Sequence, residues 1–360
     1  MYDYLIVGAG LFGATFARLA RDSGKSCLVI DKRNHIGGNC YSEKIEGIDV
    51  HKYGAHIFHT NNKKVWGFVN RFSEFNNYIN SPKAYSKGKL YSLPFNMNTF
   101  YEIWGVTNPI EAQEIINSQK FIGKPSNLEE QSLSMVGKDI YDILIKEYTE
   151  KQWGKLPTEL PTFIIKRLPV RFTFDNNYFT DQYQGIPVDG YDAFINKILK
   201  DVEVRLNIDY FYNREYFNKI SKKVVYTGRI DEFFDYEFGK LEYRSLKFNH
   251  QIREVDNFQG NAVINYCDKS IPYTRVIEHK HFTKHSSPNT VISFEYPQEY
   301  TSASIPYYPI NDNLNQFIFQ KYKEKSDSLT NFIFGGRLSE YKYMDMDSVI
   351  KSAMNKFGDF

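Results

Sequence analysis

The chain has 360 residues, enough to bury a substantial core and to form more than one domain. Its 45 Lys and Arg residues nearly balance its 43 Asp and Glu residues, which excludes the basic excess typical of nucleic-acid-binding proteins. The aromatic content of 17% is high, and a surplus of Tyr suits a pocket that stacks rings and hydrogen-bonds phosphates.

The first residues, MYDYLIVGAG, do not resemble a secretory signal, because they read as a strand and a turn with no basic segment before them. No apolar run approaches the roughly 20 residues that cross a bilayer. Cys27, Cys40 and Cys267 are scattered along the chain, so they indicate neither a disulfide framework nor a thiolate metal site. We expect a cytoplasmic protein with no nucleic-acid or membrane partner.

The N-terminal segment has the pattern of a dinucleotide-binding β-α-β unit. A strand over Tyr2–Val7 leads into a helix expected from Leu11 to Ser23, and a second strand over Ser26–Ile30 ends at Asp31. The G-x-G-x-x-G motif consists of Gly8, Gly10 and Gly13. Such glycines allow a tight turn and close approach to a pyrophosphate, and the carboxylate can bind a ribose. The pattern predicts a Rossmann-type fold, while nicotinamide, flavin and purely structural interpretations remain open.

The loop DKRNHIGGN, residues 31–39, distinguishes between these cofactors. A nicotinamide-binding fold usually begins its second helix soon after the acid, whereas this chain has a basic, glycine-rich loop. The loop resembles the FAD-binding signature of amine-oxidase-like flavoproteins. The alternative is an ordinary surface loop, which its position directly after the acid disfavours.

Helical and then strand-like patterns follow. Asn108 and Pro109 are typical of a helix start, and Asn127 with Glu130 resembles a capping box. Short alternating runs further on predict an antiparallel sheet, and two other runs predict strands that return to the nucleotide-binding sheet. The runs for the antiparallel sheet are 167–174, 262–268, 274–282 and 289–297, and the returning strands are 202–209 and 223–231.

The expected fold is therefore an α/β protein in which a discontinuous Rossmann-type FAD-binding domain carries an inserted helical-bundle domain and a twisted antiparallel sheet domain. The expected boundaries are 1–76, 190–236 and 326–360 for the FAD-binding domain, 97–155 for the helical domain, and 77–96, 156–189 and 237–325 for the sheet, which binds substrate.

Six long blocks, spread over nearly the whole chain, are similar to bacterial UDP-galactopyranose mutases. They are HKYGAHIFHT (51–60), YTEKQWGK (148–155), RLPVRFTFDNNYF (167–179), YTRVIEHKHF (273–282), IPYYPIN (305–311) and FGGRLSEYKYMDMD (334–347). The resemblance implies a cytoplasmic FAD enzyme, usually a homodimer, that interconverts UDP-galactopyranose and UDP-galactofuranose for a cell-wall or surface polysaccharide.

The reaction implied by the resemblance is a ring contraction without net redox change that still needs reduced FAD. The chemistry is nucleophilic: flavin N5 attacks the anomeric carbon as UDP leaves, and the adduct opens through an iminium and recloses through the 4-hydroxyl. The protein must therefore neutralise a departing diphosphate and retain UDP.

Within this resemblance, individual residues of the chain match functional positions of the family. Catalytic roles fall to Arg167, Arg275 and His56. Substrate binding falls to the same two arginines and to Tyr148, Thr149, Trp153, Tyr178, Asn77, Asn265, Tyr308 and Tyr343. Together with the N-terminal motif, cofactor binding is expected from Gly8, Gly10, Gly13, Asp31, Arg33, Gly38, Asn39, His56, Gly336, Arg337, Tyr343 and Asp345.

Physical chemistry supports these roles. A guanidinium forms bidentate, charge-assisted bonds to phosphate, and a flat base needs an aromatic partner. Gly335 and Gly336 allow close approach to the flavin, and a helix starting near residues 345–347 can stabilise negative charge on its pyrimidine side. The role of Arg171 stays open.

Other interpretations have weaker support. The histidines of HIFHT and HKHFTKH could suggest a metal, but neither group has a companion acid at convincing spacing, so we expect none. An amine-oxidase-type flavin oxidoreductase is the main alternative, and it predicts an apolar cavity rather than paired arginines and tyrosines. A non-catalytic FAD sensor is the third possibility.

Overall fold

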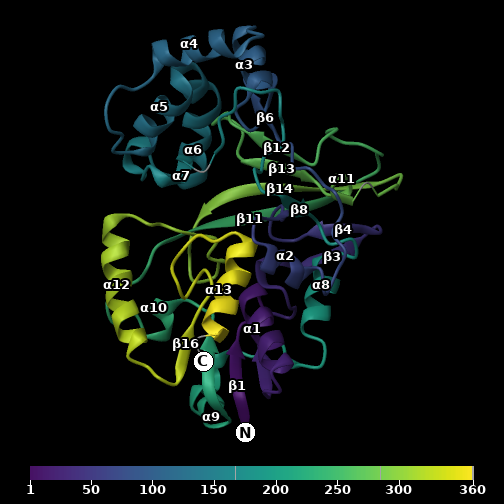
Figure 1. The fold of residues 1–360 in the computed structure, drawn as a ribbon, viewed down its shortest axis with the longest axis vertical. Helices are drawn as coiled ribbons and strands as arrows, with labels where there is room; N and C mark the ends of the chain where they lie inside the picture. Colours follow the sequence, from purple (N-terminus) through teal and green to yellow (C-terminus); the bar gives the residue numbers. More distant parts are fainter. Residues whose placement is uncertain (167, 284, 359–360) are drawn as a thin grey trace.

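The computed structural model describes residues 1–166, 168–283 and 285–358. Figure 1 shows three regions: a group of helices at the top, a long twisted sheet across the middle, and a second sheet at the bottom, where both chain ends lie.

The lower region is built on a parallel sheet. The predicted first strand, Tyr2–Val7, lies at its centre, and the two runs predicted to return to this sheet supply neighbouring strands. Among the described residues, five parallel strands form the sheet in the order β16 (Phe332–Phe334), β10 (Ser221–Tyr226), β1 (Tyr2–Val7), β2 (Cys27–Ile30) and β9 (Glu203–Arg205).

Both faces of this sheet are buried, as expected for parallel strands joined by helices. Leu5 packs with Phe233 and other aromatic residues on one face, whereas Ile6 packs with Phe16 on the other. The helices around the sheet are α1 (Leu11–Asp22), α8 (Tyr191–Ile198), α9 (Arg214–Lys219), α10 (Ile230–Phe233), α12 (Asn313–Asp327) and α13 (Met346–Gly358). The Rossmann-type unit predicted from the sequence is confirmed.

The central sheet is largely antiparallel, with one parallel pair between β12 and β6. In the described chain its seven strands run in the order β15 (Tyr308–Pro309), β11 (Tyr243–Arg253), β14 (Thr290–Glu299), β13 (Arg275–Glu278), β12 (Val263–Tyr266), β6 (Lys83–Ser86) and β7 (Lys89–Ser92). Two small pairs connect it to the lower region: β3 (Ser42–Ile45) with β4 (Ile48–His51), and β5 (Phe58–Thr60) with β8 (Tyr183–Gly185).

The upper region packs helices around a separate apolar core. Its elements are α3 (Met97–Trp104), α4 (Pro109–Gln119), α5 (Leu128–Ile140), a π-helical turn (Tyr141–Ile145), α6 (Lys146–Trp153) and α7 (Phe163–Lys166). Two short helices lie outside this region, α2 (Lys63–Val69) and α11 (Lys280–Thr283). In the described residues, no helix has the length and apolar character that a membrane span needs.

The predicted helix starts in this region are largely confirmed. Asn108 caps α4 by accepting a hydrogen bond from the Glu111 amide. Asn127 caps α5, but the capping box is not complete, because the Glu130 carboxylate accepts hydrogen bonds from Ser126 instead. The Glu130 side chain thus bonds to Ser126, one residue before the N-cap Asn127 whose amide a capping box would use.

One predicted strand is wrong. In the described part of residues 167–174, pairing is limited to an isolated bridge between Phe95 and Val170. Pro169 removes a backbone donor from this segment. The Arg171 guanidinium donates to the carbonyls of Asn177 and Phe179, so this arginine holds a loop together.

Candidate active site

A cavity of about 680 Å³ lies where the lower region meets the central sheet. It contains every residue that the sequence assigns to cofactor binding. Those lining residues are Gly8, Gly10, Gly13, Asp31, Arg33, Gly38, Asn39, His56, Gly336, Arg337, Tyr343 and Asp345. Segments from both ends of the chain therefore line one space.

The glycine turn at the end of β1 has little room for side chains. A Cβ on Gly13 would lie 2.0 Å from the carbonyl oxygen of Gly8, so this position requires glycine for helix-to-strand packing. Gly8 has a φ of +111°, and a Cβ there would lie 2.0 Å from Thr227 Oγ1. Gly10 is more open, since the nearest atom to a Cβ would be Gly38 Cα at 3.9 Å. Backbone thus lines the cavity at Gly10.

Asp31 joins the glycine turn to the basic loop. Its Oδ2 accepts a hydrogen bond from the Ala9 amide at 2.8 Å, and its Oδ1 accepts one from the Arg33 amide at 2.8 Å. Each carboxylate oxygen keeps a second lone pair that a ribose hydroxyl can use. Arg33 donates from Nη2 to Asn39, while its Nη1 is buried and has no hydrogen-bond partner among the described residues. An unpartnered guanidinium nitrogen beside an open glycine turn fits a bound diphosphate.

The glycine pair near the C-terminus has two distinct roles. Gly336 lines the cavity with a φ of +86°. A Cβ on Gly335 would lie 2.0 Å from Cζ of Phe12, so that glycine makes room for a ring of α1. Helix α13 starts at Met346, as predicted, and Asp347 accepts a hydrogen bond from Thr60 at 2.9 Å.

The opposite wall centres on Arg275, which lies on β13 directly between Asn265 on β12 and Glu295 on β14. Directly opposite residues share one face of an antiparallel sheet. The Arg275 Nε donates to Asn265 Oδ1 at 3.1 Å, and Nη1 lies 3.5 Å from Glu295 Oε2. All three residues line the cavity. The sequence reasoning missed Glu295, which is 1% exposed, because only the strand register brings it to Arg275.

The groups around Arg275 stabilise its charged form. Burial by itself lowers its pKa, but the Glu295 carboxylate and the phenols of Tyr148 and Tyr308 hold that pKa well above its ordinary value. A permanently charged guanidinium on a cavity wall is suited to an anionic ligand such as a diphosphate.

Aromatic side chains continue this wall. The rings of Tyr308 and Tyr343 stack with centroids 6.1 Å apart, and the Arg337 guanidinium lies 4.9 Å from the Tyr343 centroid. Trp153 on α6 lies 6.1 Å from Tyr308, and Tyr178 also lines the cavity. The structure therefore brings Tyr178, Tyr308 and Tyr343 to the same cavity as Arg275.

His56 lines the cavity as a neutral imidazole. Its Nδ1 lies 2.7 Å from the Gly54 carbonyl oxygen, which can only accept, so Nδ1 carries the hydrogen and Nε2 is an acceptor. Burial, with smaller contributions from Arg337 and Arg275, lowers the pKa of His56 to about 4. Its ring can accept a hydrogen bond at neutral pH.

Four predicted substrate residues are not among those that line the cavity. Tyr148 still lies near it, because its hydroxyl is 3.5 Å from Arg275 Nη2. Thr149 is buried in α6, and Trp153 reaches the cavity wall through Tyr308. Asn77 is exposed, whereas Asn80 lines the cavity with a buried Oδ1 that has no partner among the described residues. The prediction for Arg167 lies outside the described residues.

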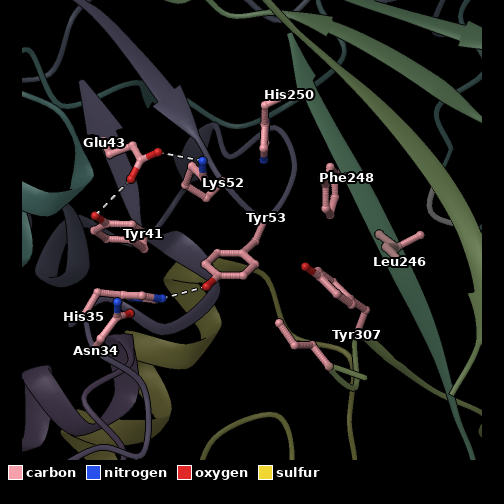
Figure 2. A pocket seen from close by; sticks show the side chains of 11 residues that line it. Asn34, His35, Tyr41, Glu43, Lys52, Tyr53, Leu246, Phe248, His250 and Tyr307 are labelled. Carbon is pink, nitrogen blue, oxygen red and sulfur yellow. Dashed lines mark hydrogen bonds and ion pairs between the residues drawn. The ribbon is translucent and has the colours of Figure 1, made fainter. Parts of the chain in front are cut away.

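A smaller cavity of about 400 Å³ adjoins the large one and shares Tyr53, Leu246, Ile305 and Tyr307 with it. Figure 2 shows that its polar side chains point toward one another. Lys52 pairs with Glu43 at 2.6 Å, and His35 Nε2 lies 2.6 Å from the Tyr53 hydroxyl. These internal pairs make the smaller cavity less suited to an anion than the wall at Arg275.

The fold and the cavity define a Rossmann-type, dinucleotide-binding enzyme with a cationic site opposite the glycine turn. Residues 143–343 match the family model described as UDP-galactopyranose mutase, and residues 6–72 match that for an NAD(P)-binding Rossmann-like domain. The chain belongs to the UDP-galactopyranose mutase family, and its cofactor is a flavin. It is an isomerase.

Several curated relatives match over nearly their full length. The dTDP-fucopyranose mutase of Escherichia coli is 42% identical, over 98% of this chain and 97% of its own. A probable UDP-galactopyranose mutase of Klebsiella pneumoniae is 39% identical, over 99% of this chain and 94% of its own. Flavin-containing amine oxidase A of Sus scrofa is 26% identical over only 43% of this chain, so the amine-oxidase alternative has weak and partial support.

Solved structures support the fold. A reduced UDP-galactopyranose mutase superposes with a TM-score of 0.75 at 12% identity, covering 99% of this chain and 95% of its own. A putative protoporphyrinogen oxidase from Exiguobacterium gives a TM-score of 0.66 at 12% identity, covering 99% and 98%. The predicted combination of a Rossmann-type unit, helices and an antiparallel sheet is confirmed.

Proposed function

We propose that this chain interconverts UDP-galactopyranose and UDP-galactofuranose with reduced FAD as its cofactor. The observation that carries the proposal is Arg275, a charged residue between Asn265 and Glu295, which shares a cavity with the glycine turn. The whole-chain identity of 39% to the Klebsiella pneumoniae relative supports this substrate.

Different residues of the cavity would bind the cofactor and act on the substrate. Gly10, Asp31 and Arg33 would hold the FAD diphosphate and ribose, and reduced FAD would supply the nucleophile for the anomeric carbon. Arg275 would neutralise the departing diphosphate, with Arg167 as its partner. His56 would orient a hydroxyl through its acceptor Nε2.

The remaining substrate contacts belong to this proposal too. Tyr178, Tyr308 and Tyr343 would bind the diphosphate region, while Tyr148, Thr149 and Trp153 would contact the uridine. Asn265 would lie near the sugar and Asn77 near the nucleotide. We also infer a cytoplasmic homodimer whose product enters a cell-wall or surface polysaccharide.

A second substrate pair, dTDP-fucopyranose and dTDP-fucofuranose, is favoured by the Escherichia coli relative, at 42% identity. The two substrates differ in the base methyl group, the ribose 2′-hydroxyl and the sugar 6-hydroxyl. The reacting ring atoms are the same, so the binding wall described above serves either substrate.

The test is to incubate the purified, flavin-loaded enzyme with each furanose nucleotide, with and without dithionite, and to separate the products by chromatography. Pyranose product from UDP-galactofuranose that appears only under reduction supports the main proposal. Faster conversion of dTDP-fucofuranose would establish the second candidate instead. Amine oxidation without dithionite, or no turnover of either nucleotide, would contradict both.

A further inference from the structure

Lys151 on α6 makes an unusual set of contacts with a loop of the central sheet. Within the described chain, its Nζ lies within hydrogen-bonding distance of four backbone carbonyl oxygens: 2.7 Å from Tyr266, and 2.9 Å from each of Asp268, Ile271 and Tyr273. An ammonium group has three hydrogens to share among such acceptors, and hydrogen bonds from a charged donor are stronger than neutral ones. The loop of residues 266–273, the "carbonyl loop", thus encloses this ammonium.

The two segments that Lys151 joins are those that carry the proposed nucleotide contacts. Helix α6 supplies Tyr148 and Trp153, three residues before and two after the lysine. The carbonyl loop connects β12, with Asn265, to β13, which begins at Arg275. The Tyr148 hydroxyl and Arg275 Nη2 meet 3.5 Å apart, so a shift of helix against loop would change their separation.

Other contacts between helix and loop are fewer or more exposed. Glu147, one turn before Lys151, accepts a hydrogen bond from the Lys269 amide at 2.7 Å. The ion pair between Lys269 Nζ and Glu150 spans 3.0 Å, but the lysine side chain is 67% exposed, so water screens it. Lys151 itself lies outside the residues that line either cavity. Any influence on the site must therefore act through the helix and the loop.

We propose that Lys151 is a positioning residue that holds α6 against the carbonyl loop, sets the distance between Tyr148 and Arg275, and thereby determines affinity for the nucleoside diphosphate. This inference rests on the proposed function, because it takes that wall to bind UDP. It predicts an effect on ligand binding without an effect on flavin binding, since Lys151 contacts neither the glycine turn nor Asp31 and Arg33, which are proposed to hold the FAD diphosphate and ribose.

The first experiment measures UDP binding to the oxidised, flavin-loaded enzyme by calorimetry. Lys151→Met keeps the aliphatic stem but cannot donate, and we expect its UDP Kd to rise about tenfold while flavin content stays unchanged. In turnover, KM should rise with kcat within about threefold. Lys280→Met is the matched control, because Lys280 is a buried lysine whose Nζ also donates to backbone carbonyls, those of Asp256 and Ser287, away from the cavity. Its Kd should stay within about twofold of wild type.

A second experiment separates positioning from general stability. In Lys151→Ala, ammonium ions can enter the vacated space, so ammonium chloride should tighten UDP binding and tetramethylammonium chloride, which is too large, should not. Lys151→Gln keeps two N–H donors without the charge, so we expect its UDP Kd to lie above that of wild type but below the tenfold rise expected for Lys151→Met. This variant tests the inference if Lys151→Met and Lys151→Ala do not fold. A wild-type enzyme that fails to bind UDP would overturn the proposed function. Equal UDP affinity in wild type and the Lys151 variants would overturn this inference alone.

Discussion

One wall of the large cavity is mainly backbone from the first forty residues, whereas the opposite wall consists of side chains from strands and helices far apart in the chain. The first wall contains Gly8, Gly10 and Gly13, whose places depend on one continuous strand, turn and helix. The second wall contains Arg275 and Glu295, which meet only because two strands pair in one register.

This difference means that the two walls should respond differently to mutation. The glycine wall depends on space, so an added methyl group acts through steric overlap with backbone. The Arg275 wall depends on charge and hydrogen bonds, so the loss of one group leaves its neighbours in place but unpaired. Variants on one wall should therefore remove the flavin, and variants on the other should remove activity while the flavin stays bound.

The largest expected effect is from Gly13→Ala. Its methyl group would lie 2.0 Å from the Gly8 carbonyl oxygen, so strand and helix must separate. We expect flavin content below about a tenth of wild type, measured by visible absorbance per protein, because the shifted turn can no longer approach the diphosphate. Gly67→Ala is the matched control: Gly67 lies in α2 with nothing within 4 Å of an added Cβ. Normal flavin content in Gly13→Ala would refute the steric account of this wall.

The same contrast explains what could be predicted from the sequence. The elements from β1 to β2 follow from local apolar patterns and glycine spacing, so their bounds agree with the structure within a residue or so. Strands β12, β13 and β14 were predicted from alternation, but their order and register were not, because pairing depends on contacts between distant segments. Glu295 lies within a predicted strand and still could not be recognised as a partner of Arg275.

Errors arose where local contacts override a pattern. Residues 167–174 alternate like a strand, yet Pro169 and the loop contacts of Arg171 limit pairing in the described part of that segment to the bridge at Val170. The sequence assigns no role to Lys151 within the block YTEKQWGK, because its carbonyl partners lie more than a hundred residues later in the chain.

The next largest expected effect is a loss of activity from substitutions on the wall that contains Arg275 and Glu295. Arg275→Ala removes the charge proposed to neutralise the diphosphate, and we expect kcat/KM to fall by about 10²–10³-fold with flavin content unchanged. Glu295→Gln keeps the shape of the partner but removes its charge, and a fall of about tenfold is expected because Arg275 is then less firmly held. Steady-state kinetics under dithionite measures both.

The control for these variants is Arg253→Ala, on an exposed part of β11. It should leave kcat/KM within about twofold of wild type. Activity near wild type in Arg275→Ala would contradict the diphosphate assignment. Loss of flavin in that variant would instead remove the distinction between the two walls.

The prediction with the least effect on catalysis is a pH dependence of stability from three histidines: His51 on β4, His56 on the cavity wall and His250 on β11. Burial lowers the pKa of His51 to about 3 and the pKa values of His56 and His250 to about 4, against 6.5 for an unperturbed histidine. Below pH 6.5 the unfolded chain therefore binds protons at these rings that the folded chain does not. Stability from these groups is complete above about pH 6.5 and declines as pH falls toward 4, by up to about 1.4 kcal/mol per pH unit for each ring.

Urea unfolding between pH 7 and 4.5 measures this decline. His51→Gln should reduce the slope, because a buried ring with a strongly lowered pKa is gone, whereas His285→Gln, at an exposed position, should leave the slope unchanged. Activity should behave differently: His56 stays neutral above about pH 4, so its ionisation produces no break in kcat between pH 5 and 8. A slope equal in wild type and His51→Gln would show that His51 is not kept neutral by burial, and the pH sensitivity of the fold would then have to come from other groups, such as His56 and His250.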